Sequence, residues 1–153
     1  MEQIKLNLGS GKRKLEGYVN IDNRPEVDPD VVCDVIEGLP YHDNSINEVR
    51  AFDFLEHIPL GKTIKAIEDI YRVLKPGGFF EHFTPSTDGR GAFQDPTHLS
   101  FWNINTWIHY TNKQWNVYGI KAFFGVIRLE DVVTDKENKI IHTAGLMYAI
   151  KGA

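Results

Sequence analysis

The sequence is poor in cysteine and has no excess of positive charge. Cys33 is the single cysteine among 153 residues, so an intramolecular disulfide is excluded. Lys and Arg number 17 against 21 Asp and Glu, which gives a formal net charge of −4. Proteins that bind nucleic acids by neutralising phosphates are usually basic. We therefore expect no nucleic-acid partner, and the scarcity of cysteine favours a cytoplasmic location.

Long apolar runs and metal-binding spacings are also missing. No apolar stretch approaches the ~20 residues that span a bilayer, and the N-terminal MEQIKLNLG lacks a signal pattern. None of the six histidines forms an H-x-x-x-H pair, and one cysteine cannot form C-x-x-C. We expect no membrane partner and no bound metal. The length suits a single domain, residues 1–153.

Short apolar segments predict five strands in the first half of the chain. They cover residues 3–8, 18–22, 30–35, 48–53 and 79–84. The connections are too long for simple hairpins and suit parallel crossovers, which favours an α/β sheet. IKLNL alternates apolar and polar residues, and FFEHF carries Glu81 and His82. Strands covered on both faces are nearly continuous apolar runs, so one sheet face is expected to be thinly covered.

The sequence also predicts one clear helix and one hairpin. Apolar residues at helical spacing predict a helix over 64–74, and LKPGG then stops it. The β-rich segments 125–135 and 139–152, joined by the polar turn DKENK, predict an antiparallel hairpin. The loop 85–100 is long enough to suggest a function. The aromatic residues of 101–124 are more typical of a core than of a binding cage.

The stretch LNLGSGKRKLEGYVNID, residues 6–22, raises a specific question. Gly9 and Gly11 permit positive φ and a close approach of backbone to a ligand, so the stretch is either a cofactor loop or a tight turn. The run from Gly11 to Tyr18 is too short for a full crossover helix. The first helix is therefore expected to be reduced or missing.

The order of motifs resembles a known family. LNLGSG, Asp22, Asp34-x-x-x-x-Leu39-Pro40, Leu55-Glu56-His57 and LKPGG follow one another over roughly residues 4–85. This order is similar to that of the class I S-adenosylmethionine-dependent methyltransferases, in particular the small bacterial and phage-type "type 11" relatives. DPTHLSFW, residues 95–102, is also similar to a segment after their fifth strand. The resemblance implies a Rossmann-like, mostly parallel sheet with a C-terminal antiparallel hairpin.

The resemblance implies S-adenosyl-L-methionine as cofactor and assigns residues to it. The loop after the first strand would lie under the methionine part, Asp22 would accept hydrogen bonds from the ribose, and Asp34 would contact the adenine amino group. The full set of cofactor-binding residues is Leu8, Gly9, Ser10, Gly11, Asp22, Asn23, Asp34, Val35, Phe52 and Phe54. A dinucleotide-binding G-x-G-x-x-G would need glycine at position 14, where Lys14 stands, and this weakens a nicotinamide hypothesis.

Catalysis by such a protein depends mainly on alignment. Holding nucleophile, methyl and sulfur in line can supply ~7–11 kcal/mol of the barrier, and a general base adds perhaps ~10²–10⁴-fold where the nucleophile needs deprotonation. His57 and His98 are the candidate bases, because a neutral imidazole is available near pH 7. The predicted function is methyl transfer to a small-molecule oxygen or nitrogen acceptor. A non-catalytic cofactor-binding domain, a regulatory partner subunit and a homo-oligomer stay open.

Overall fold

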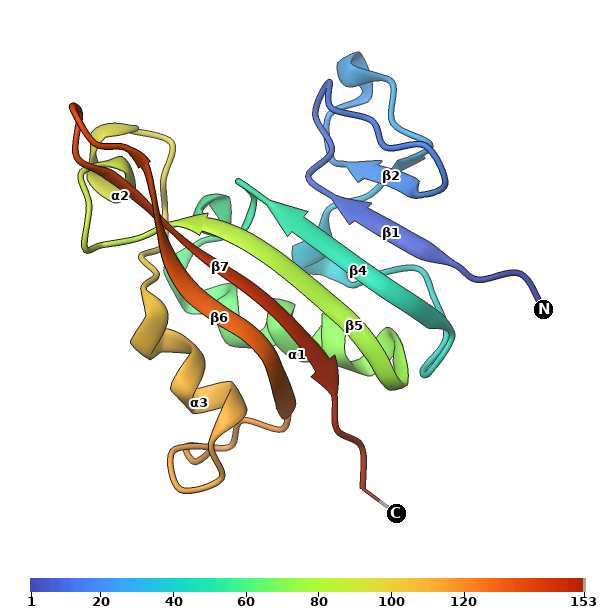
Figure 1. Ribbon diagram of the computed structural model, residues 1–153. Coiled ribbons are helices and arrows are strands. Elements are labelled where there is room, and N and C mark those ends of the chain that lie inside the picture. The colour runs from blue at the N-terminus through green and yellow to red at the C-terminus, as the bar shows by residue number, and fades with distance from the viewer. Residues whose placement is uncertain (153) are drawn as a thin grey trace.

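A seven-stranded sheet forms the body of the molecule in the computed structural model, which describes residues 1–152 (Figure 1). The order across the sheet is β3-β2-β1-β4-β5-β7-β6. Strands β1 to β5 pair in parallel, and β7 pairs antiparallel with both β5 and β6. The strands are β1 (Lys5–Leu8), β2 (Val19–Asp22), β3 (Val31–Val32), β4 (Ile46–Phe52), β5 (Leu74–Pro85), β6 (Phe124–Asp135) and β7 (Ile140–Ala149). This confirms the Rossmann-like sheet and the C-terminal antiparallel hairpin.

The predicted loss of the first helix is confirmed. Between β1 and β2 the chain makes only turns, over residues 9–18. The described helices are α1 (Thr63–Val73), α2 (Gly91–Gln94) and α3 (Ile108–Thr111), with 3₁₀ turns η1 (Pro25–Val27), η2 (Val35–Glu37), η3 (Leu55–His57), η4 (Leu60–Lys62) and η5 (Ile104–Trp107). Within residues 1–152, none of these helices has the length and apolar character that crossing a membrane requires.

Helix α1 covers the middle of one sheet face, behind β4 and β5 in the view of Figure 1. Ala66, Ile67, Ile70 and Val73 are its buried residues, at the three- and four-residue spacing that predicted the helix. The helix ends at Val73, one residue earlier than predicted, because Leu74 already adopts extended backbone and opens β5.

The hydrophobic core lies between the sheet and the helices on this face. Leu6 and Leu8 of β1, Val49 of β4 and Phe80 of β5 are fully buried in it. The aromatic segment contributes as expected, since Trp107 packs edge-on against Phe80 at a ring centroid distance of 5.9 Å. The aromatic residues of this segment that are buried are therefore core residues and do not form a binding cage.

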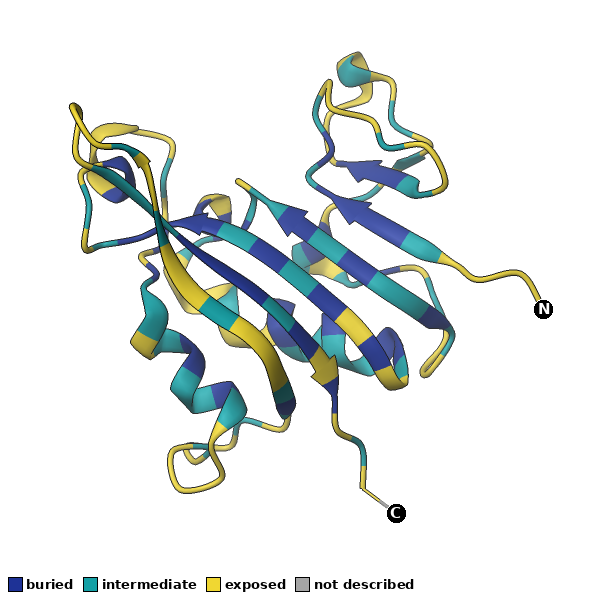
Figure 2. Ribbon diagram, in the orientation of Figure 1, coloured by how far each residue is buried: buried dark blue, intermediate teal, exposed yellow. Residues whose placement is uncertain are grey.

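The opposite face of the sheet carries no helix among the described residues, and buried residues alternate with more exposed ones along β4 and β5 (Figure 2). Glu48 of β4 pairs with Lys5 of β1 at 3.3 Å between Oε2 and Nζ. Glu81 of β5 lies between two arginines, 3.8 Å from Arg50 of β4 and 3.9 Å from Arg128 of β6. These contacts cross the sheet from β1 to β6. The polar alternation of the strand sequences is thus explained by a two-layer architecture with one solvated face.

His82 of β5 points the other way, into the core. Its side chain is almost fully buried, and neither ring nitrogen has a hydrogen-bond partner among the described residues. The ring stacks on Trp107 with 3.9 Å between centroids. Burial lowers the pKa of His82 from 6.5 to about 3, because a charged imidazolium would lose its hydration there. The folded protein therefore keeps this ring neutral over most of the acidic range.

This burial predicts a loss of stability in acid. Between pH 6.5 and about 3 the unfolded state binds a proton at His82 that the folded state does not. The free energy of unfolding should therefore fall as the pH drops below 6.5, by up to about 1.4 kcal/mol per pH unit from this residue. His82→Leu removes the titration, and its denaturant-derived stability should change less steeply from pH 6.5 to 4.5. His42→Leu, at an exposed position, should keep the wild-type slope; equal slopes in all three proteins would contradict the prediction.

Candidate functional site

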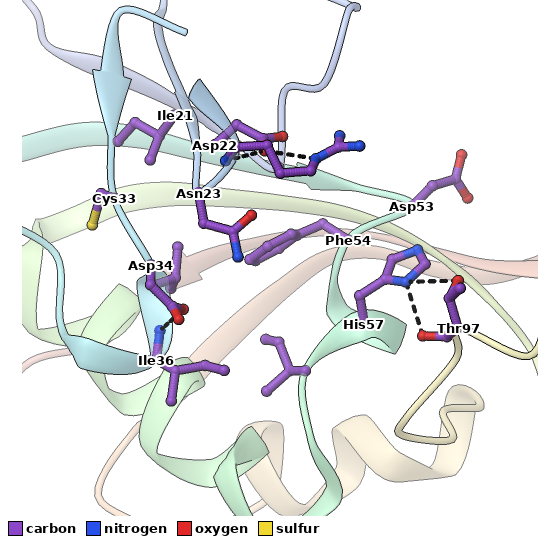
Figure 3. Close-up of a pocket in the computed structure, with 14 residues that line it drawn as sticks. Ile21, Asp22, Asn23, Cys33, Asp34, Ile36, Asp53, Phe54, His57 and Thr97 are labelled. Atoms are coloured by element: carbon purple, nitrogen blue, oxygen red, sulfur yellow. Dashed lines mark hydrogen bonds and ion pairs between the residues drawn. The ribbon is translucent and has the colours of Figure 1, made fainter. Parts of the chain in front are cut away.

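A pocket of about 400 Å³ lies at the carboxyl ends of the parallel strands (Figure 3). In sheets of this type, ligands bind outside these ends at the point where the strand order reverses, here between β1 and β4. Segments that follow β1, β2, β3 and β4 all reach the pocket. Its lining residues are Gly9, Ile21, Asp22, Asn23, Arg24, Cys33, Asp34, Val35, Ile36, Asp53, Phe54, His57, Ile58 and Thr97.

The glycine loop after β1 is shaped by two positive φ angles. Gly9 has φ 62° and Gly11 has φ 49°, a region that disfavours other residues. At Gly9 there is also no space for a side chain, because an added Cβ would lie 2.3 Å from Cδ2 of Phe54. At Gly11 the nearest heavy atom would be 3.5 Å away, on Arg24. Gly9 is therefore needed both for its backbone conformation and for the close packing of Phe54.

Asp22, the last residue of β2, organises this loop through its carboxylate. Oδ2 accepts a hydrogen bond from the backbone N–H of Gly11 at 2.8 Å. Oδ1 accepts from the backbone N–H of Arg24 at 3.0 Å and from its Nε at 3.1 Å. Burial alone would raise the pKa of Asp22, but the bonds from Arg24 and Gly11 outweigh it and lower the pKa. A carboxylate at this position is therefore ionised and already pointed at the loop.

Asp34 follows the short strand β3 and begins the next turn. Its side chain is exposed and accepts a hydrogen bond from the N–H of Ile36 at 3.1 Å, which caps η2. The predicted strand over 30–35 is shorter in the structure, because this cap bends the chain after Cys33. Val35 is buried at the base of the pocket. Both residues line the pocket.

Phe54 and Asp53 follow β4 and form the rim nearest that strand. Figure 3 shows the Phe54 side chain extending toward Asn23. Asp53 has φ 48°, an unusual value for a residue other than glycine. Its Oδ1 lies 3.2 Å from Nε2 of His142 on β7, and its Oδ2 lies 3.9 Å from Arg13. Asp53 thus links the β4 end to the glycine loop and to the C-terminal hairpin.

His57 and His98 come together at one side of the pocket, although the sequence separates them widely. Their rings meet edge to face with 5.1 Å between centroids. His57 lines the pocket, and its Nδ1 lies 3.1 Å from the carbonyl oxygen of Thr97. His98 lies just outside the lining, with Nδ1 3.1 Å from the carbonyl oxygen of Ala92. The loop after β5 therefore returns to the end of β4 and brings Thr97 and His98 beside His57.

Glu56, between Leu55 and His57, has the most unusual environment in the site. The residue is 2% exposed, and its Oε2 has no hydrogen-bond partner among the described residues. Burial, with a smaller contribution from the nearby Asp53 and Asp95, raises the pKa of Glu56 to about 8. The backbone carbonyl of Glu56 also accepts hydrogen bonds from Leu99 and Ser100, which fastens the returning loop. Sequence reasoning did not single out this carboxylate, although it stands within the LEH motif.

The structure does not bring every predicted residue into the pocket lining. Those that line it are Gly9, Asp22, Asn23, Asp34, Val35, Phe54 and His57, whereas Leu8, Ser10, Gly11, Phe52 and His98 do not. Gly11 still takes part through its bond to Asp22. Phe52 lies on the helix-free face, with the guanidinium of Arg50 3.7 Å above its ring centroid. Arg24 and Thr97 were not predicted from the sequence and do line the pocket.

Comparison with known proteins finds one matching family and many solved structures with the same fold. A model of the family described as "Methyltransferase domain" matches residues 13–81. Curated protein sequences gave no match. Among solved structures, a SAM-dependent methyltransferase from Archaeoglobus fulgidus aligns with a TM-score of 0.72 at 16% identity, over 95% of this chain and 86% of that one.

Two further structures show how varied such proteins are. The [4+2]-cyclase SpnF aligns with a TM-score of 0.71 at 15% identity, over 98% of this chain and 76% of the other. A structure described as a complex between the Haloferax volcanii Trm112 methyltransferase activator and "the putative methyltransferase" aligns with a TM-score of 0.69 at 16% identity, over 98% of this chain and 84% of the other. At these identities the likeness establishes the fold. The reaction and the partners do not follow from the fold alone.

Proposed function

Because the chain has the class I S-adenosylmethionine-dependent methyltransferase fold, and residues 13–81 match the methyltransferase-domain family, we propose that it binds S-adenosyl-L-methionine and transfers its methyl group to a small-molecule acceptor. The observation that carries this proposal is the convergence of four strand ends on one pocket of about 400 Å³. That volume is within the range of small-molecule and cofactor sites.

In this proposal the cofactor's adenosine part lies between the ends of β2 and β3. The ribose hydroxyls donate to Asp22, and the adenine amino group donates to Asp34. The methionine part follows the glycine loop at Gly9, where the positive φ shapes the backbone and Phe54 packs against it. Asp22 is ionised, and its Oδ1 already accepts two hydrogen bonds from Arg24, so the ribose hydroxyls would displace the Arg24 side chain from this oxygen.

The acceptor would enter on the side of His57. Nδ1 of His57 faces a carbonyl oxygen, which can only accept, so the ring proton is held at Nδ1 and Nε2 keeps a free lone pair. The same argument applies to His98 and the carbonyl of Ala92. Both rings are therefore in the tautomer that can take a proton at Nε2. An oxygen or nitrogen acceptor that must lose a proton would use this side of the pocket.

The alternative is a domain that binds the cofactor without transferring its methyl group. Two structures with this fold support the alternative. One is a [4+2]-cyclase, and another is a complex with a methyltransferase activator. The open connection between β1 and β2 also leaves one side of the glycine loop uncovered by a helix. A regulatory subunit could use such an opening for a partner.

Calorimetry and a turnover assay separate these functions. Titration with S-adenosylhomocysteine should show one binding site per chain, and titration with NAD⁺ should show none. Incubation with methyl-labelled S-adenosylmethionine and a broad panel of hydroxyl and amine compounds should then release S-adenosylhomocysteine. Binding without turnover across the panel would support the non-catalytic alternative. Absence of binding would reject both.

A further inference from the structure

Three side chains with metal-binding atoms meet at the acceptor side of the pocket. Glu56, His57 and His98 each present one ligand atom, and the three atoms lie within 4.8 Å of one another. Glu56 and His57 belong to η3 after β4, whereas His98 comes from the loop after β5. Two separate segments of the chain are therefore packed together at this cluster.

A hydrogen bond at Nδ1 already orients each of the two imidazole rings. Nδ1 of His57 donates to the carbonyl of Thr97, and Nδ1 of His98 donates to the carbonyl of Ala92, each at 3.1 Å. Such a bond to a backbone carbonyl fixes the tautomer and turns the Nε2 lone pair outward, as it does for histidines that bind metals. In the neutral rings neither Nε2 carries a hydrogen. The two atoms that face the cluster are thus electron-pair donors.

Glu56 adds a third donor that has no partner. Its Oε1 lies 3.8 Å from Nε2 of His57, which is too long for a hydrogen bond. Its Oε2 is buried and unpaired among the described residues. A buried carboxyl oxygen without a hydrogen-bond partner is costly. We propose that Glu56, His57 and His98 bind a divalent metal ion of the zinc class.

The ligand set indicates the kind of ion. Two imidazoles with one carboxylate are typical of Zn²⁺ and of Fe²⁺, whereas Mg²⁺ prefers oxygen ligands alone. Bonds of about 2.1 Å to a tetrahedral ion place ligand atoms roughly 3.4 Å apart, so the cluster must contract by about 1 Å. His57, whose side chain is 40% exposed, has room to move.

The sequence predicts no bound metal, because it contains no H-x-x-x-H or C-x-x-C spacing of metal ligands. The structure provides the cluster by tertiary contact instead: His98 reaches His57 only because the loop after β5 returns to the carbonyl of Glu56. Metal sites assembled from distant segments leave no short motif. The absence of H-x-x-x-H is therefore no argument against this site.

A role for the ion in methyl transfer rests on the proposed function. Three protein ligands leave a position open for an acceptor hydroxyl group, whose pKa the ion lowers. The acceptor gives its proton to solvent, its oxygen then forms a bond to the methyl carbon, and the carbon–sulfur bond breaks to leave neutral S-adenosylhomocysteine. The acceptor class that this site favours is therefore a hydroxyl compound rather than an amine.

Metal titration of the whole chain tests the site directly. After treatment with EDTA and dialysis, calorimetric titration with Zn²⁺ should give one site per chain, and Co²⁺ should give visible absorption bands typical of nitrogen and oxygen ligands. Mg²⁺ should give no comparable binding. Glu56→Gln, His57→Ala and His98→Ala should each weaken Zn²⁺ binding on the order of 100-fold while circular dichroism shows an unchanged fold.

A matched control is available at His109. Its Nδ1 also lies near a backbone carbonyl, that of Trp115 at 3.2 Å, but it is not part of the cluster. His109→Ala should bind Zn²⁺ like the wild type. No stoichiometric binding, or equal binding by all variants, would overturn the metal proposal. Because S-adenosylhomocysteine binding is measured separately, a wild type that binds it but not Zn²⁺ refutes the metal site alone.

Discussion

Asp22→Ala is expected to weaken the binding of S-adenosylhomocysteine by at least ~100-fold. The carboxylate is 5% exposed, holds the glycine loop through Gly11, and in the proposed complex accepts the ribose hydroxyls. Hydrogen bonds to a charged group contribute about 1.5–3 kcal/mol each. Losing two of them corresponds to roughly 10²–10⁴ in affinity. Isothermal titration of wild type and variant measures the change.

Two controls make this result specific. Asp28→Ala removes a carboxylate that is exposed and bonded to Lys14, and it should leave the affinity unchanged. Asp22→Asn keeps the shape and one oxygen acceptor, so its affinity should lie between wild type and Asp22→Ala. The fold is checked by near-ultraviolet circular dichroism, because Asp22 also supports the loop. A folded Asp22→Ala protein with nearly wild-type affinity would refute the ribose assignment.

Gly145→Ala is expected to lower the free energy of unfolding by about 3 kcal/mol. Gly145 of β7 lies directly opposite His82 of β5, and an added Cβ would be 2.1 Å from Nε2 of that ring. The ring cannot move aside, because it is almost fully buried and stacked on Trp107. Denaturant unfolding of the two proteins at pH 7 measures the loss.

Gly125→Ala provides a control, because its added Cβ would come equally close to a neighbouring side chain. Its Cβ would lie 2.1 Å from Cζ of Tyr148, but that side chain is at the surface and free to rotate. The cost should be less than about 1 kcal/mol. In the double variant Gly145→Ala/His82→Ala, the new methyl group occupies space that the imidazole has left. Its loss of stability should be smaller than the sum of the two single losses, and strict additivity would argue against the overlap.

Much of the fold could be predicted because its signals are local. Ile67 and Ile70 show the helical period, and the short segment between Gly11 and Tyr18 leaves no room for a helix. Strand ends were less predictable. The β-branched residues of 30–35 favour a longer strand than β3, but the side chain of Asp34 bonds to the N–H of Ile36 and turns the chain. That local competition between a cap and a strand is not visible in residue propensities.

The site was predictable where motif order determines position. Gly9 and Asp34 each follow a parallel strand and Asp22 ends one, so they had to meet at one edge of the sheet. Phe52 shows a signal that was overlooked: Val49 and Ala51 face the core, so strand alternation directs Phe52 to the opposite face.

The cluster of Glu56 with two histidines was not predictable in the same way. It depends on the path of the loop after β5, which returns to the β4 end through backbone hydrogen bonds from Leu99 and Ser100 to Glu56. No periodicity encodes such a return.

The open architecture of the sheet has a consequence for aggregation. Strand β6 is a long edge strand, and the face beside it has no helical layer, a combination that invites pairing with another chain. Arg128, Glu130 and Asp131 place charges along this edge, and the register shifts near Val126 and Val133 interrupt a regular ladder. These features oppose strand addition. The charged pairs that replace the missing helix layer therefore also act as protection against self-association of the sheet.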